Sequence, residues 1–172
     1  IAKLKAEFLQ HYHDANGVPF RSRLVAGFSD GARLGSLWPG LYNLLFQAPP
    51  IRKMFNRLVG FHPDRTLPKL NRITLHRWFH SHRPLAPLGM RRGRVHLFCD
   101  EFTNYNDLDA GVATVELLER LGYEVVIPKH VESGRASLSK GMLRRAKKFA
   151  ERNVRLLSGV VSRDQPLIGI EP

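Results

Sequence analysis

Three short apolar runs in the second half of the chain are each followed by a polar loop. The runs are 95–98, 123–127 and 166–170. Their length and their β-branched residues favour strands over helices. The segments between them repeat apolar residues at helical spacing, so the predicted order is strand, helix, strand, helix, strand.

The two intervening helices are predicted at 107–121 and 139–157. Residues that commonly cap helices stand near their ends. The candidate N-caps are Asn106 or Asp107 for the first helix and Ser137 or Ser139 for the second, and Gly122 follows the end of the first.

Two consecutive right-handed crossovers make the three strands parallel, with the spatial order 2-1-3. The predicted fold class is therefore α/β: an N-terminal helical region followed by a Rossmann-like three-stranded parallel βαβαβ half-domain. Parallel strands bring their following loops to one carboxyl edge, where open α/β sheets bind ligands. We expect any functional site at that edge.

The first half of the chain is predicted to be helical and is interrupted by Gly and Pro. The predicted helices are 1–16, 21–28, 41–46 and 51–59. A stretch with several Pro and Gly residues, 83–94, is typical of a linker. The chain is thus divided into a helical connector region (1–82), a linker (83–94) and a truncated α/β unit (95–172).

The net charge of +12 is unevenly distributed. Residues 1–94 contain 16 Lys and Arg against 4 acids, whereas residues 95–172 contain 11 of each. The basic half is expected to face an acidic partner, namely another protein domain or a membrane surface. Nucleic acid is not expected, because the basic residues lack aromatic interleaving and any helix-turn-helix or zinc-finger spacing.

Cysteine content and hydropathy bear on the location of the protein. The single Cys, Cys99, excludes an internal disulfide framework and suits a reducing compartment. No apolar run reaches transmembrane length, and no signal-peptide pattern opens the chain. We expect a cytoplasmic location, with association at the inner face of the membrane as an alternative. Because the chain opens at Ile1 and stops directly after a strand, we also expect it to be part of a longer polypeptide.

The candidate binding residues are in the loops after the first two strands. They are Cys99, Asp100, Glu101, Asn104, Tyr105, Ser133, Gly134 and Arg135. A Gly-containing loop before a helix N-terminus suits an anion, although a simple turn explains the same residues. Asp100 and Glu101 are interpreted first as helix-end acids and second as functional carboxylates.

A metal site is a further hypothesis for the same edge. Its ligands would be Cys99, His130, Glu132 and Glu171, because thiol, imidazole and carboxylate donors together suit zinc or iron. The alternative is that Cys99 is a small buried hydrophobe and that the carboxylates face solvent. A second group, His76, His80 and His82, lies among Arg residues, and a structural or surface role is favoured for it.

Three segments of the chain together resemble a known domain. They are Phe98-Cys99-Asp100-Glu101-Phe102-Thr103-Asn104-Tyr105, Glu132-Ser133-Gly134-Arg135 and Leu138-Ser139-Lys140-Gly141. It is the cysteine-rich domain of bacterial flavin and iron–sulfur oxidoreductases of the glycolate oxidase and D-lactate dehydrogenase type. In that domain a Cys after the first strand is followed, some thirty residues later, by Cys-Cys-Gly. Cys99 has the first position here, and Glu132-Ser133-Gly134 stands in the second place. The opening segment, 1–9, resembles the helix after the cysteines of a ferredoxin-like module in the same family.

The resemblance implies a parent enzyme with FAD and [4Fe–4S] clusters that oxidises a 2-hydroxy acid such as glycolate or lactate and passes electrons onward. Thiolates are the usual ligands of such clusters, and one Cys cannot hold a cubane. We therefore expect no cofactor in this chain. Its role would be structural or associated with electron transfer, with the parent's other domains as partners. The alternatives are a non-catalytic module that docks an acidic partner or a membrane surface, and a hydrolase that uses the loop carboxylates.

Overall fold

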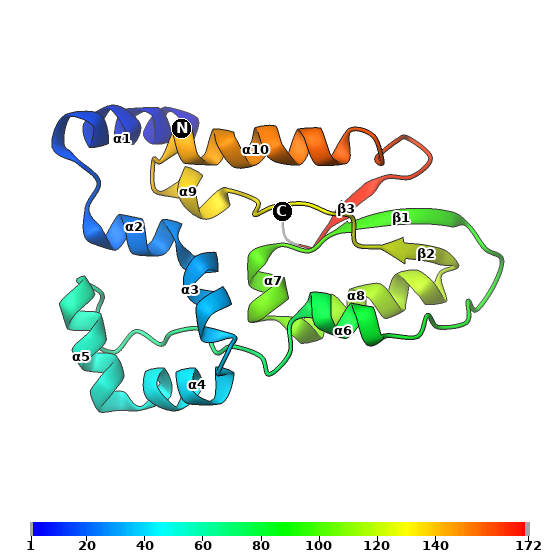
Figure 1. Ribbon diagram of the computed structural model, residues 1–172, viewed down its shortest axis with the longest axis horizontal. Helices are drawn as coiled ribbons and strands as arrows, with labels where there is room; N and C mark the ends of the chain where they lie inside the picture. Colours follow the sequence, from blue (N-terminus) through cyan, green and yellow to red (C-terminus); the bar gives the residue numbers. More distant parts are fainter. Residues whose placement is uncertain (1, 171–172) are drawn as a thin grey trace. The chain divides into compact units, whose positions relative to one another are not determined.

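The computed structural model describes residues 2–170, which form two units (Figure 1). Unit 1 comprises the chain up to Arg72 together with Ser133–Phe149. Unit 2 comprises Ile73–Glu132 and the chain from Ala150 onward. Helix α10 therefore contributes its first half to unit 1 and its second half to unit 2.

Unit 1 is helical. Its elements are α1 (Ala2–Asn16), α2 (Phe20–Ala26), α3 (Phe28–Gly35), α4 (Pro39–Gln47), α5 (Pro49–Val59), α9 (Arg135–Ser139) and the first half of α10 (Leu143–Leu157). The predictions of helices at 1–16, 41–46 and 51–59 are confirmed to within two residues. The predicted helix 21–28 is wrong at its end, because Gly27 ends α2 and the chain continues into α3.

Unit 2 contains the sheet. Its elements are α6 (Leu75–Ser81), β1 (Gly93–Phe98), α7 (Glu101–Tyr105), α8 (Leu108–Arg120), β2 (Tyr123–Val126), the second half of α10 and β3 (Leu167–Gly169). The strand order is β2-β1-β3, and β1 pairs with both neighbours in parallel. The predicted α/β class, the parallel sheet and the order 2-1-3 are confirmed.

The core of unit 2 lies between the sheet and α8. Val95 and Leu97 of β1 pack with Val125 of β2 and Val115 of α8. Trp78 and Phe79 of α6 pack against this cluster, among other partly buried residues. Burial of Val95, His96 and Leu97 in succession is typical of a central parallel strand, which is covered on both faces.

A close approach between helices occurs at Gly111 of α8. A Cβ atom there would lie 2.5 Å from Cδ2 of Leu75 and 3.0 Å from Cγ2 of Thr103, and both of these side chains are buried. The absence of a side chain at Gly111 thus allows α6, α7 and α8 to meet.

The predicted linker is attached to α8 through a buried carboxylate. Glu119 Oε2 accepts hydrogen bonds from Nε2 of His82 at 2.8 Å and from the backbone N–H of Leu85 at 2.9 Å. Glu119 is buried and His82 is mostly buried, and Trp78 stacks on the imidazole. Further along, the backbone N–H of Leu88 donates to the carbonyl of Arg120 at the end of α8, and that of Arg92 donates to the carbonyl of Gly122 just beyond it.

The predicted helix 139–157 is confirmed from Leu143 onward, as α10, and is wrong at its start. The chain instead forms the short helix α9, turns at Lys140–Met142 and begins α10 at Leu143. Gly141 has a φ of +68°, and a Cβ atom there would collide with Leu9 of α1. Packing of α1 against this turn, together with the left-handed backbone of Gly141, prevents a continuous helix.

Two glycines in helices provide a test of the packing in the core of unit 2. We predict that Gly111→Ala lowers the free energy of unfolding by about 1–3 kcal/mol, because the new methyl group overpacks Leu75 and Thr103. The matched control is Gly31→Ala in α3, where no atom would meet the added Cβ within 4 Å. It should raise stability by about 0.5–1 kcal/mol. Equal effects of both changes in chemical denaturation would contradict the close approach.

Candidate functional site

The carboxyl end of β1 leads into α7 through Asp100. Its carboxylate accepts hydrogen bonds from the backbone N–H groups of Phe102 and Thr103 and from the hydroxyl of Thr103 at 2.6 Å. Asp100 is buried and is the N-cap of α7. Of the two interpretations of this acid, the helix-end role is the one that the geometry matches.

His130, in the loop after β2, lies against the same strand end. Its Nε2 accepts the backbone N–H of Cys99 at 3.3 Å, and its Nδ1 pairs with the carbonyl of Val131 at 2.9 Å. Because a carbonyl only accepts, the hydrogen that Nδ1 shares with this carbonyl belongs to Nδ1. The ring also stacks on Phe98, with 4.2 Å between centroids. Both nitrogens of His130 are thus used within the protein.

The loop after β2 is held by Asn153, in the second half of α10. Asn153 accepts the backbone N–H of Val131 at 2.8 Å and donates to the carbonyl of Glu132 at 2.9 Å. Sequence reasoning did not identify Asn153. Its only signal was an amide side chain among the charged and apolar residues of α10.

The Cys99 side chain is buried, with 3% of the residue exposed. Burial is the main cause that raises the pKa of its thiol, and the charges of Asp100 and Glu101 raise it further, to about 12. At neutral pH the sulfur is therefore a thiol. A thiol is a poor nucleophile and a poor metal ligand, so this geometry matches the interpretation of Cys99 as a small buried hydrophobe.

His76 of α6 lies beside His130, with 5.8 Å between the ring centroids. Its backbone N–H donates to the side chain of Asn104 at 3.1 Å. Burial lowers the pKa of His76, and the neighbouring His130 and His80 lower it further. The imidazole of His76 is therefore neutral at pH 7. The sequence analysis did not place His76 at the carboxyl edge of the sheet.

The three histidines near residue 80 do not form a cluster of ligands. His80 pairs through Nδ1 with the carbonyl of His76 at 2.7 Å, whereas His82 pairs with Glu119. The favoured structural role therefore agrees with the observed contacts of His80 and His82.

The other predicted site residues are divided between the two units. Glu101, Asn104, Tyr105 and Glu132 belong to unit 2, whereas Ser133, Gly134 and Arg135 belong to unit 1. The Ser133 hydroxyl accepts the backbone N–H of Arg135, and Gly134 has the left-handed backbone that begins α9. Helix α9 has only five residues.

The metal hypothesis of Cys99, His130, Glu132 and Glu171 stays a prediction, since Glu171 lies outside the described residues. Within residues 2–170 no group of three or more His, Cys, Asp and Glu is placed to hold a metal ion. The donors that are described do not suit an iron–sulfur cluster, because the one thiol of the chain is buried and protonated. Among residues 2–170, no helix has both the length and the apolar content that a membrane span requires.

The chain was compared with known proteins. No family model matches it, and no solved structure matches it. It is similar to D-2-hydroxyglutarate dehydrogenases of several bacteria. The identity is 28% with that of Escherichia coli (strain K12) over 181 residues, 27% with that of Pantoea ananatis (strain AJ13355) over 181 residues and 26% with that of Pseudomonas putida (strain KT2440) over 179 residues.

Each of these alignments covers 100% of this chain but only 17–18% of the relative. The chain therefore spans less than a fifth of the length of the curated relatives that it matches. By name these relatives are dehydrogenases of a 2-hydroxy acid, which supports the predicted resemblance to 2-hydroxy-acid oxidoreductases at that coarse level.

The state of Cys99 can be tested by alkylation. We predict that iodoacetamide modifies the folded chain at pH 8 at least tenfold more slowly than the chain unfolded in guanidinium, because the buried group is almost entirely thiol. Mass spectrometry measures both rates. Equally fast modification of the two forms would contradict a buried thiol.

The same raised pKa predicts a dependence of stability on alkaline pH. A group whose pKa is raised in the folded state makes its full contribution to stability at pH values below its ordinary pKa, which is 9.0 for this thiol. That contribution is lost as the pH rises toward the folded-state pKa of about 12. Between pH 9 and 11 the wild-type chain should therefore lose more stability than Cys99→Ala. Parallel pH profiles of the two proteins would contradict this.

Proposed function

We propose that this chain is part of a larger oxidoreductase that acts on a 2-hydroxy acid. The observation that supports this is the similarity to D-2-hydroxyglutarate dehydrogenases along the full length of the chain. The substrate would be D-2-hydroxyglutarate or a close relative such as glycolate or lactate. FAD and [4Fe–4S] clusters would be bound by other parts of the polypeptide and would pass the electrons onward.

Within that enzyme, the proposed role of this chain is structural or associated with electron transfer. The polar groups at the carboxyl edge of β1 are occupied by hydrogen bonds within the protein. Asp100 caps a helix, both nitrogens of His130 are paired, and the thiol of Cys99 is protonated. A site prepared for catalysis would keep such groups available to a substrate. The edge therefore acts as a rigid scaffold, and the chemistry belongs elsewhere.

A second candidate function, a docking module, is favoured by the apolar surface of unit 1. The segment 34–51 contains no charged residue, and Arg33 and Arg52 border it. Several of its large apolar side chains are more than half exposed: Leu34, Leu37, Trp38, Leu41 and Leu44. Unit 1 carries 17 Lys and Arg against 4 Asp and Glu, whereas unit 2 carries 10 against 11.

We propose that this surface, the 34–51 surface, packs against another domain of the same oxidoreductase. That domain would present apolar side chains bordered by carboxylates, since exposed apolar patches of this kind mark interaction sites and the border here is basic. A second copy of the chain is a less favourable partner for this surface, because two strongly basic units repel each other.

The proposed enzymatic role predicts that the longer polypeptide has dehydrogenase activity and that chain 1–172 alone has none. The longer polypeptide should reduce dichlorophenolindophenol with D-2-hydroxyglutarate as donor, and glycolate and D-lactate tested in parallel would rank the substrates. Chain 1–172 alone should be inactive and colourless, because it has one thiol and no dinucleotide-binding Gly pattern. Cys99→Ala in the longer polypeptide should keep its activity. Brown or active chain 1–172 would contradict the proposal.

The docking role predicts the effect of charge on the 34–51 surface. Leu41→Glu/Leu44→Glu should reduce binding of the dye ANS by chain 1–172 at least threefold and should destabilise the longer polypeptide, because it places carboxylates in the proposed contact. The control is Leu88→Glu, an exposed position of unit 2, which should change neither. Co-sedimentation of the wild-type chain with anionic phosphatidylglycerol vesicles, lost in the double variant, would instead indicate a membrane partner and overturn the proposal.

A further inference from the structure

Helix α5 exposes a row of three apolar side chains. Ile51, Met54 and Leu58 follow one another at spacings of three and four residues, so they share one face of the helix. They are 36%, 60% and 77% exposed, respectively. The row, called here the α5 row, is about 10 Å long, since each helical residue adds about 1.5 Å. Ile51 is the last residue of the 34–51 surface, so the α5 row continues that surface onto the next helix.

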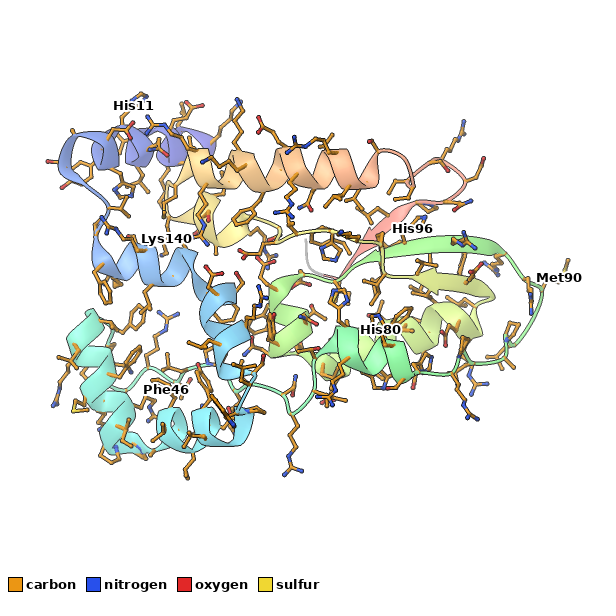
Figure 2. All side chains as sticks on the ribbon, viewed as in Figure 1. His11, Phe46, His80, Met90, His96 and Lys140 are labelled. Atoms are coloured by element: carbon orange, nitrogen blue, oxygen red, sulfur yellow. The ribbon has the colours of Figure 1, made fainter. Side chains whose placement is uncertain are left out.

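The other faces of α5 pack within unit 1. Asn56 is buried, and its amide donates to the carbonyls of Pro63 and Arg65 in the segment that follows the helix. Phe55 contacts Phe46 of α4, with 5.0 Å between the ring centroids, and Phe46 lies in the angle between the two helices (Figure 2). The α5 row is therefore the apolar face of this helix that contacts within unit 1 leave exposed.

Both ends of α5 are fixed. Pro49 and Pro50 stand in its first turn, and Gly60 ends it with a left-handed φ of +76°. Arg21 of α2 donates to the carbonyl of Gly60 at 2.9 Å. A partner that docks on a helix already held in place does not have to offset the cost of ordering it. The α5 row is thus a preorganised contact face.

The cations of α5 differ in what they contact. The helix contains Arg52, Lys53 and Arg57 and no acid. Lys53 forms an ion pair with Asp64 at 3.0 Å, whereas Arg52 is half-buried and donates to the carbonyl of Gln47 at 3.4 Å. Arg57 is exposed, and within residues 2–170 no carboxylate forms an ion pair with it. Because it follows Met54 by three residues, it lies beside the α5 row, where a carboxylate of a partner would complement it.

A helix is the element that matches the α5 row. The backbone groups of α5 are paired within the helix, so α5 offers no sheet edge that a strand could extend. A single row of side chains at helical spacing packs as a ridge into the groove of another helix. A lipid surface is less favourable, because anionic lipid attracts clusters of unpaired cations, and the ion pair of Lys53 with Asp64 removes one from this border.

We propose that the α5 row docks an amphipathic helix from another domain of the longer polypeptide. That helix presents apolar side chains at helical spacing to Ile51, Met54 and Leu58, and a carboxylate at the border of its apolar face pairs with Arg57. The inference rests on the proposed docking role of unit 1 and identifies the element that this role requires of the partner.

Photocrosslinking in the longer polypeptide tests the contact. The photoreactive residue p-benzoylphenylalanine replaces Leu58 or, as the control, Leu117, which is a 58% exposed leucine on α8 of unit 2. Position 58 should crosslink within the polypeptide to a segment whose apolar residues recur at helical spacing beside Asp or Glu. Position 117 should give less than a third of that yield with the same segment. Crosslinks from position 58 to lipid, to a second copy or to a segment without this pattern would overturn the proposal, as would equal yields from the two positions.

Charge reversal at Arg57 gives a second readout. Arg57→Glu should lower the crosslinking yield from position 58 at least threefold, because it places two carboxylates against each other. Arg155→Glu is the matched control, since Arg155 is likewise an exposed arginine in the last turn of a helix, and it should leave the yield unchanged. Equal losses in the two variants would contradict the pairing with Arg57.

A synthetic peptide of the crosslinked segment reports the secondary structure of the partner. Circular dichroism should show that the peptide gains helix when it binds chain 1–172, and Met54→Ala/Leu58→Ala should weaken binding at least tenfold. Binding without a gain of helix, or equal affinity for the double variant, would overturn the assignment. The docking role itself is tested separately by Leu41→Glu/Leu44→Glu. If that variant destabilises the longer polypeptide but position 58 does not crosslink, the docking role stands and the helix contact is wrong.

Discussion

The pairing of β1 on both of its sides is the constraint on which the architecture of unit 2 depends. A buried strand needs partners for its backbone N–H and C=O groups along both edges. The partners are β2 and β3, from later parts of the sequence. Parallel pairing requires a crossover for each, and α8 and α10 lie in those connections. The same geometry brings the ends of β1 and β2 together, with Cys99 beside His130.

The polar residues at the carboxyl ends of β1 and β2 form hydrogen bonds that connect neighbouring elements of unit 2. Asp100 ends the strand and begins α7, Asn104 of α7 fixes the backbone of His76, and His130 accepts the N–H of Cys99. Residue types that indicate a catalytic or binding site in a sequence can thus serve only to form hydrogen bonds within the protein. At this edge, Asp100 and both nitrogens of His130 are engaged in hydrogen bonds within the protein.

The distribution of charge separates the two units more sharply than it separates the two halves of the sequence. The cationic first half of α10 belongs to unit 1 with the basic N-terminal helices, whereas unit 2 is nearly neutral. Unit 1 therefore combines a positive potential with the apolar 34–51 surface.

The sequence by itself determined the parallel sheet, its strand order and most of the helices, because hydrophobic periodicity and the handedness of crossovers are local rules. It also favoured Asp100 as a helix-end acid, but it left Cys99 open between a small buried hydrophobe and a metal ligand. The break at Gly141 could not be derived in this way, since it depends on the approach of Leu9 from a distant helix. The same holds for Asn153, His76 and His13, whose hydrogen-bond partners are 21 to 127 residues away. Only tertiary packing decides which polar side chains are satisfied within the protein and which remain available to a ligand.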